Sequence, residues 1–236
     1  KTVKSRGAAD EEFKLDYIGA GMMSTPDMSI LEAKKEVAKF GGLTSRMSGF
    51  TQTLLTEQNG KAKNKLHSKI KKYEEITDRV EIEVANYLAR VSEGEMTEET
   101  AQKIRAMNSI ANDLERIGDL FYQMSKEIER KDERKIYFMP EQRESLLDMF
   151  KLVDNAFEIM IDNLNANWDG VLIDPALDAE RAINLKRDKM RKEHLENLGK
   201  KNFNMEAGMS FSNLFATCEK VGDHIINVSE AVTGQI

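Results

Sequence analysis

Several residue types are scarce in this sequence of 236 residues. It has one cysteine, three prolines and one tryptophan, and aromatic residues make up only 7% of it. The single Cys218 excludes an intramolecular disulfide and fits a reducing compartment. Alternating runs rich in Val, Ile, Thr and Tyr are missing, which argues against a β-sheet. No charge-free apolar stretch approaches the ~20 residues of a membrane-spanning helix, and no signal peptide opens the chain.

A basic stripe is missing as well. The formal net charge is -6 and the sequence pI is about 5.4, which argues against a nucleic-acid-binding protein. One basic segment, from Lys61 to Lys72, is followed at once by Glu74 and Glu75. We interpret this segment as the solvated start of a helix. Contact with an anionic membrane surface is the alternative.

The sequence is rich instead in the pattern of long amphipathic helices. Apolar residues make up 40% of it and charged residues 32%, which suits helices with one buried and one solvated face. Residues 1–27 have no sustained period, and we interpret them as a linker or arm. Start and stop signals then predict six helices, over about 25–58, 63–91, 97–131, 140–169, 175–199 and 204–234. The predicted fold class is all-α.

The third and sixth helical stretches repeat each other. Both place apolar residues along one arc, and they align without a gap, SIANDLERIGDLFYQMSKEI against NLFATCEKVGDHIINVSEAV. The identical positions pair Glu115 with Glu219, Gly118 with Gly222, Asp119 with Asp223 and Ser125 with Ser229. The matching phase indicates an internal duplication. We therefore predict two tandem three-helix bundles, 28–135 and 136–236, related by a pseudo-twofold axis or packed end to end.

Pairs of carboxylates recur on three of the predicted helices. In each pair the acids are four residues apart, which puts them on one helix face about 5–6 Å apart at Cβ. Such like charges destabilise an isolated helix by a few tenths of a kcal/mol, and a mid-helix glycine adds about 1 kcal/mol relative to alanine. Because the sequence repeats both features, we expect a compensating cation, and hard oxygen ligands favour Mg, Ca, Mn or iron. The pairs are Glu74 with Asp78, Glu115 with Asp119, and Glu219 with Asp223.

Two alternatives stay open at this point. Acids four residues apart also arise on solvated faces in a chain that is 32% charged, so a plain surface role is the competing interpretation. If the second and third helices are antiparallel neighbours, their acid pairs either converge over one groove or diverge. The three histidines share no spacing typical of a zinc site, and Trp168 is interpreted as an anchor at a helix end.

These residues resemble the PhoU family of phosphate-signalling regulators, whose members have a duplicated three-helix unit with E-x-x-x-D motifs. The segment 74–78 (EEITD) is similar to the family's second-helix motif. The segment 112–119 (NDLERIGD) is similar to its third-helix motif, and 219–224 (EKVGDH) is similar to a second copy of that motif. The likeness spans about 28–236.

The fifth helix departs from the family pattern, because its matching segment, 180–184 (ERAIN), ends in asparagine rather than aspartate. An asparagine oxygen can ligate a metal but carries no charge. The resemblance implies two metal grooves, in which family members bind clusters of metal ions, iron or zinc among them. The first groove is expected from Glu74, Asp78, Glu115 and Asp119. A second, weaker groove is expected from Glu180, Asn184, Glu219 and Asp223.

The start of the first helix indicates a subfamily. Thr25 to Met28, running into 30–37 (ILEAKKEV), is similar to the stretch that joins the membrane part of bacterial sodium/phosphate cotransporters to their C-terminal PhoU-like domain. Because the chain begins at Lys1 rather than methionine, we expect it to be part of a longer protein. The resemblance then implies a domain at the cytoplasmic face of the cell membrane, with the transporter's membrane domain as its partner and homo-oligomerisation as an option.

We therefore expect a non-enzymatic, metal-binding regulator of phosphate uptake with no nucleic-acid partner. One alternative is a carboxylate-bridged di-iron enzyme, which needs Glu-x-x-His on two helices. None of the three histidines has a glutamate three residues before it. The other alternative is a plain helical interaction module, whose acids are merely solvated.

Overall fold

The computed structural model describes residues 15–18, 25–198 and 204–234. Within these ranges the fold is all-α, as the sequence predicts, and no strand is present. None of the helices in this described part combines the length and apolar character of a membrane span. The elements are α1 (Pro26–Thr56), α2 (Gly60–Val91), α3 (Glu98–Glu133), α4 (Pro140–Asn165), the 3-10 helix η1 (Trp168–Gly170), α5 (Ile173–Asn197) and α6 (Met205–Thr233).

Capping side chains fix the start of α3 at its expected place and the start of α2 at Gly60, before the expected position of about 63. The Asn59 side chain accepts hydrogen bonds from the backbone N–H groups of Lys61 and Ala62, at 3.0 and 3.1 Å. The Thr97 hydroxyl accepts one from the N–H group of Thr100 at 3.1 Å. Each bond satisfies a backbone donor that has no partner inside its helix.

The junction between α4 and α5 differs from the prediction. α4 ends at Asn165, before the expected Asp169–Gly170, and α5 begins at Ile173, before the expected Pro175. The predicted end of α5 at Gly199 lies outside the described residues. Residues that the sequence pattern assigned to α4 thus form the short helix η1 and the turns around it.

Lys34 of α1 accounts for the early end of α4. Its Nζ donates hydrogen bonds to the backbone carbonyl groups of Leu164, at 2.7 Å, and Ala166. A helix C-terminus leaves such carbonyl groups without an internal partner. Trp168 lies beside this contact, with its ring centroid 5.5 Å from Lys34 Nζ and 5.6 Å from Lys103 Nζ. The tryptophan ring therefore interacts with one cation of α1 and one of α3.

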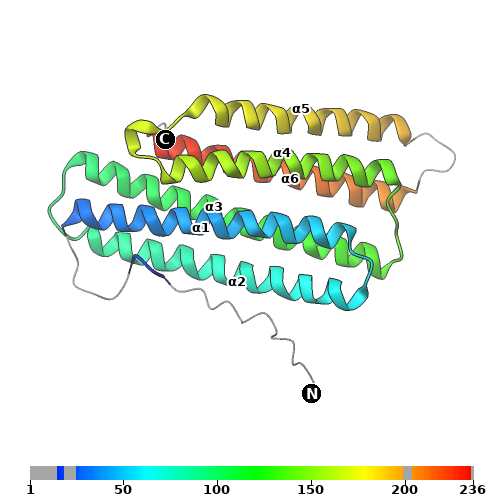
Figure 1. Cartoon of the computed structure of the whole chain (residues 1–236), viewed down its shortest axis with the longest axis horizontal. Coiled ribbons are helices and arrows are strands. Elements are labelled where there is room, and N and C mark those ends of the chain that lie inside the picture. The colour runs from blue at the N-terminus through cyan, green and yellow to red at the C-terminus, as the bar shows by residue number, and fades with distance from the viewer. Residues whose placement is uncertain (1–14, 19–24, 199–203, 235–236) are drawn as a thin grey trace, which may run out of the picture.

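The six helices run side by side along the long axis of the molecule (Figure 1). α1, α2 and α3 pack on one another, and so do α4, α5 and α6. The two bundles meet where α1 packs on α4 and α3 packs on α6. α2 and α5 lie on opposite outer sides of this central layer (Figure 1). Of the two arrangements that the sequence left open, packing end to end is therefore wrong.

The two bundles share one hydrophobic core. A single cluster of buried residues has members on all six helices. The rings of Phe121 in α3 and Phe157 in α4 stack across the interface between the two bundles, with their centroids 6.1 Å apart. The segment between α3 and α4 is packed down too, since Ile136 and Phe138 are 6% and 7% exposed. Because burying apolar surface contributes about 25 cal/mol per Å², this shared core couples the two bundles.

A short part of the predicted arm packs against α1. The fully buried Glu36 carboxylate accepts hydrogen bonds from the backbone N–H groups of Asp16 and Tyr17, at 2.9 and 2.8 Å. Ile18 is 4% exposed and belongs to the main core. Residues 15–18 are thus part of the folded unit, whereas 1–14 and 19–24 lie outside the described residues.

Two glycines allow close approach of neighbouring helices. A Cβ atom on Gly118 of α3 would lie 2.5 Å from Oγ1 and 3.1 Å from Cβ of Thr77 in α2. In the second bundle, a Cβ atom on Gly222 of α6 would lie 3.0 Å from Cδ1 of Ile183 in α5. The two contacts are equivalent in the sequence repeat. Each glycine therefore has a packing role that its position between two acids did not reveal.

Replacing Gly118 with alanine should destabilise the fold, because the added methyl group overlaps the Thr77 hydroxyl. We expect the free energy of unfolding to fall by ~1–3 kcal/mol, as is typical of overpacking, when measured by urea denaturation. Gly49→Ala is the matched control, because a Cβ atom at this exposed position of α1 meets nothing within 4 Å. There alanine should stabilise by up to ~1 kcal/mol. Equal stability of the parent and Gly118→Ala would contradict the close contact.

Candidate metal centre

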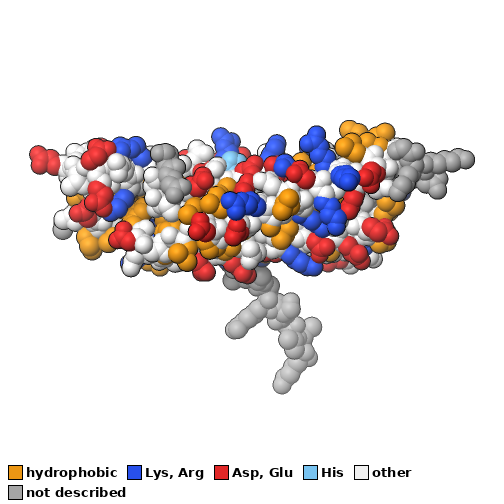
Figure 2. Space-filling view, turned by 90° about the horizontal axis from the view of Figure 1, so that it is seen from above, with side chains coloured by type: hydrophobic (Ala, Val, Ile, Leu, Met, Phe, Trp, Pro, Cys, Tyr) orange, Lys and Arg blue, Asp and Glu red, His pale blue; other side chains and the backbone are white. Residues whose placement is uncertain are grey.

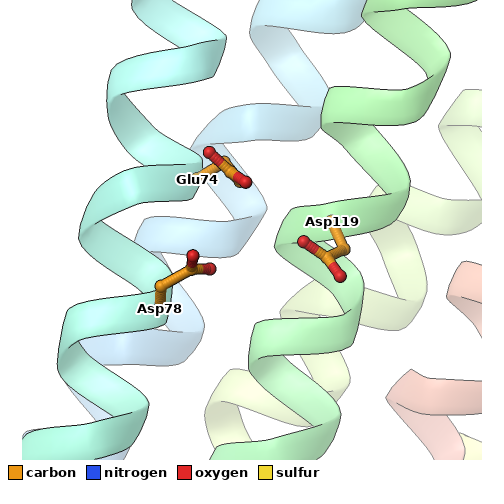
Figure 3. A group of neighbouring side chains, drawn as sticks. All are labelled: Glu74, Asp78 and Asp119. Carbon is orange, nitrogen blue, oxygen red and sulfur yellow. The ribbon is translucent and has the colours of Figure 1, made fainter.

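Three carboxylates meet between α2 and α3, and we name them the first acid cluster. Glu74 and Asp78 of α2 and Asp119 of α3 each offer one oxygen atom, and these three atoms lie within 4.8 Å of one another. Figure 3 shows the two α2 side chains on successive turns, facing Asp119 across the space between the helices. The acid pair of α2 therefore converges with one acid of the α3 pair, Asp119.

The glycine contact explains this convergence. Thr77 lies between Glu74 and Asp78 on α2 and packs on Gly118, the residue before Asp119 on α3. Because Gly118 has no side chain, the two helices approach closely at this point and bring the flanking carboxylates within reach of one another. The Thr77 hydroxyl donates a hydrogen bond to the backbone carbonyl of Glu74 at 2.7 Å. Its polar group is therefore satisfied inside α2.

Glu115, the fourth acid predicted for this site, is not a member of the first acid cluster. Its Oε2 atom lies 3.7 Å from Nε of Arg116, and Nη1 of Arg116 lies 3.9 Å from Oδ2 of Asp119. The Arg116 side chain is 56% exposed, so solvent keeps these long ion pairs weak. The structure thus brings three of the four acids together and leaves Glu115 one turn away along α3.

Burial and mutual repulsion raise the pKa values of these carboxyl groups. Burial is the largest cause for Glu74, and the charges of Asp78 and Asp119 add to it. Burial and then the charge of Asp119 raise the pKa of Asp78 and of Glu115. A raised pKa means that the folded protein holds a proton on the group more tightly than the unfolded chain does. A metal cation at the same place would relieve the same repulsion.

The oxygen atoms of the first acid cluster suit a hard metal ion. Oxygen atoms on opposite sides of one ion lie about 4.0–5.2 Å apart when each is 2.0–2.6 Å from it, as for Mg and Ca. The three oxygen atoms of Glu74, Asp78 and Asp119 lie no more than 4.8 Å apart, which is within the span of one Ca ion. Carboxylates also ligate iron and zinc, with bonds of about 2.0–2.2 Å for zinc. The residues present therefore fit a metal ion.

The equivalent residues of the second bundle are arranged differently. The Asn184 amide donates a hydrogen bond from Nδ2 to Oε1 of Glu180 at 2.5 Å. Arg187 donates one from Nη1 to Oε1 of Glu219 at 2.6 Å. Burial and the charges of Glu219 and Glu180 raise the pKa of Asp223, while Arg187 opposes the rise. In the described part of this bundle, no three acids approach as closely as those of the first acid cluster.

Sequence reasoning missed Arg187. The offset that pairs Glu74 of α2 with Glu180 of α5 also pairs Glu81 with Arg187. In the sequence, the sign of its role was the change from Glu81 in the first half to Arg187 at the equivalent position of the second half. The charge of Glu81 contributes to the raised pKa of Glu115, so this position of the repeat lies close to the acids in both halves.

The histidines and the cysteine take no part in the first acid cluster. His224 Nδ1 lies 2.7 Å from Oδ1 of Asp113, across the seam between α3 and α6. Burial lowers the pKa values of His67 and His194. Burial raises the pKa of the Cys218 thiol, which lies inside the core. Among the described residues, the closest set of potential metal ligands is therefore made of carboxylates alone.

The helices that carry the first acid cluster match a known domain. Residues 37–128 match the family model of the PhoU domain. This segment includes all four acids that were predicted for the first site. No curated protein sequence matches the chain.

Solved PhoU structures share the fold of most of the chain. The phosphate transport system regulatory protein PhoU from Streptococcus pneumoniae superposes with a TM-score of 0.72 at 16% identity, over 88% of this chain and 94% of that one. PhoU from Pseudomonas aeruginosa does so with a TM-score of 0.76 at 16% identity, over 87% and 96%. The PhoU fold therefore extends beyond the segment that the family model matches, into the second bundle.

The raised pKa values of the carboxyl groups in the first bundle predict how the metal-free protein responds to pH. The stability that protonated carboxyl groups contribute is fully present below their unfolded pKa values and is lost as the pH rises through the higher folded values. The amide side chains of the double variant Glu74→Gln/Asp78→Asn do not titrate, so this variant does not lose stability in that way as the pH rises. In a chelator it should therefore melt above the parent at pH 7, and the difference should shrink as the pH falls toward about 4. Thermal melts followed by circular dichroism measure this, and a variant that melts below the parent at pH 7 would contradict it.

Proposed function

We propose that this chain is a non-enzymatic, metal-binding regulator of phosphate transport. The observation that carries the proposal is the first acid cluster, in which three carboxylates of a PhoU domain lie within 4.8 Å of one another. The likeness to a phosphate transport system regulatory protein supports the regulatory part of the proposal. Bound metal serves as a structural or sensory element, and control of phosphate uptake is the output.

In this proposal Glu74, Asp78 and Asp119 hold the metal, which is iron, zinc or another divalent or ferric ion, and Glu115 lies near enough to adjust to it. Each pair of unit charges 4 Å apart repels by roughly 1 kcal/mol even in bulk water, and the metal removes this repulsion. It also ties α2 to α3 beside the Gly118 contact. Metal occupancy is thereby linked to the stability of the first bundle.

We further propose that the chain is the cytoplasmic regulatory domain of a sodium/phosphate cotransporter. The support is the segment from Thr25 to Val37, which is similar to the stretch that joins the membrane part of such transporters to their PhoU-like domain. The partner is then the membrane domain of the same protein, and the site of action is the cytoplasmic face of the cell membrane. Self-association of the domain is compatible with this role.

Metal should bind the parent protein and stabilise it. At a free metal concentration 100-fold above Kd, the expected gain is about 2.7 kcal/mol, or roughly 5–10 °C in Tm for a chain of this size. Bound metal is measured by mass spectrometry after dialysis against iron, zinc, manganese or magnesium, and Tm by calorimetry. The double variant Glu74→Gln/Asp78→Asn should lose both the bound metal and the gain in Tm.

The matched control for this experiment is Glu75→Gln/Glu83→Gln. It makes the same change in charge at two exposed positions of the same helix and should keep the metal and the gain in Tm. The metal proposal is wrong if the parent binds none of these ions or if Glu74→Gln/Asp78→Asn retains them.

The transport proposal predicts that phosphate uptake responds to the first acid cluster. The natural reading frame should encode hydrophobic membrane spans upstream of Lys1. In cells that carry this full frame, Glu74→Gln/Asp78→Asn should change the rate of radiolabelled phosphate uptake at low and high external phosphate, and Glu75→Gln/Glu83→Gln should not. A start codon directly before Lys1 would refute the transporter context but not the fold. Uptake that is the same in all three strains would refute the regulatory role.

A further inference from the structure

The two halves of the chain differ at the positions that lie close to their acids. The residues of the first half are Glu74, Asp78 and Glu81 on α2 with Glu115, Arg116 and Asp119 on α3. Their counterparts in the second half are Glu180, Asn184 and Arg187 on α5 with Glu219, Lys220 and Asp223 on α6. The first set therefore has five carboxylates and one cation, and the second has three carboxylates and two cations.

One of these differences turns a repulsion into an attraction. In α2, Glu74 and Asp78 each place a carboxylate oxygen within 4.8 Å of the other, where two negative charges repel. In α5, Asn184 stands in the place of that aspartate and donates a hydrogen bond to Glu180 at 2.5 Å. The pair on α5 therefore needs no external cation.

The second difference supplies a cation from the chain itself. Arg187 stands where the first half has Glu81, and its Nη1 atom lies 2.6 Å from Oε1 of Glu219. The bond joins α5 to α6 close to the contact between Ile183 and Gly222. At the equivalent place between α2 and α3, the neighbouring cation Arg116 belongs to α3 itself and lies 3.7 Å and 3.9 Å from its two acids on that helix.

Partial burial of Arg187 and Glu219 strengthens this ion pair. Its side chain is 25% exposed and that of Glu219 is 20% exposed, so water screens the pair less than an ion pair on the open surface. A charge-assisted hydrogen bond of this length is also among the strong ones. Arg181 and Lys189 pair with acids of their own helix, whereas Arg187, whose Nε atom also lies 2.9 Å from Oδ1 of the neighbouring Asp188, reaches across to α6. Figure 2 shows cationic and anionic side chains interspersed over the face that carries α5.

We propose that Arg187 is a built-in cation that takes the place of a metal ion in the second half, so that only the first acid cluster depends on metal. The residues expected from sequence to form a second, weaker metal site then need no metal. This inference rests on the proposed metal role of the first bundle only for its contrast between the halves. The packing of α5 on α6 is then the same at every metal concentration. The packing of α2 on α3, and of the shared core on which it rests, depends on bound metal.

The first test removes the bridge in the absence of metal. In a chelator, Arg187→Gln should lower Tm by several degrees, because Glu219 loses its partner. Arg191→Gln is the matched control, since Arg191 is exposed and lies one turn further along α5, and it should leave Tm unchanged. Equal melting temperatures for the two variants would overturn the proposal. This test needs no bound metal, so it holds even if the first acid cluster binds none.

The second test gives the second half the residues of the first. Asn184→Asp/Arg187→Glu recreates the acids of α2 and should raise bound Mn²⁺ or Zn²⁺ by at least one equivalent per chain over the parent. The reciprocal variant Glu81→Arg should lower the metal content of the first half. A folded double variant that gains no metal would overturn the proposal. If the parent binds no metal but the double variant does, the role of Arg187 is supported and the metal role of the first acid cluster is refuted. If the double variant fails to fold, the melting comparison of Arg187→Gln with Arg191→Gln decides.

Discussion

The close approach of paired helices at a glycine is the constraint on which the candidate site depends. Gly118 accepts Thr77 of α2 at a distance that leaves no room for a Cβ atom, and Gly222 accepts Ile183 of α5 in the same way. Each contact lies between the two acids of a helix, so it sets how far apart the facing carboxylates are. With a larger residue at Gly118, the helices would separate and the acids of α2 would face solvent.

The shared core determines where these contacts lie in the molecule. α1, α3, α4 and α6 form the central layer, and α2 and α5 pack on its two outer sides (Figure 1). Both acid-bearing pairs therefore combine one central helix with one outer helix. Each outer helix packs against fewer neighbouring helices than a central helix does. A bound ion or an internal ion pair therefore affects the packing of α2 and α5 most.

The two halves share the scaffold but differ in their charges. The glycine contacts, the helix order and the positions of Glu115 and Glu219 are common to both halves. In the first half three carboxylates converge, and Arg116 lies 3.7 Å from Glu115 and 3.9 Å from Asp119. In the second half, a hydrogen bond from Asn184 and an ion pair from Arg187 balance the acids. The same backbone arrangement thus carries clustered acids in one half and internally paired acids in the other.

The sequence by itself determined the six helices, most of their ends, the internal repeat and the helix faces that carry acids. These follow from the helical period and from local hydrogen bonds such as that of Thr97, which depend on residues a few positions apart. Only the tertiary structure decided that Asp119 joins the acids of α2, that Glu115 stays apart, and that Arg187 reaches across to α6. It also decided that the bundles lie side by side. The reason is that the rotation and spacing of one helix against another are set by side chains far apart in sequence, such as Thr77 on Gly118, and no local pattern encodes that match.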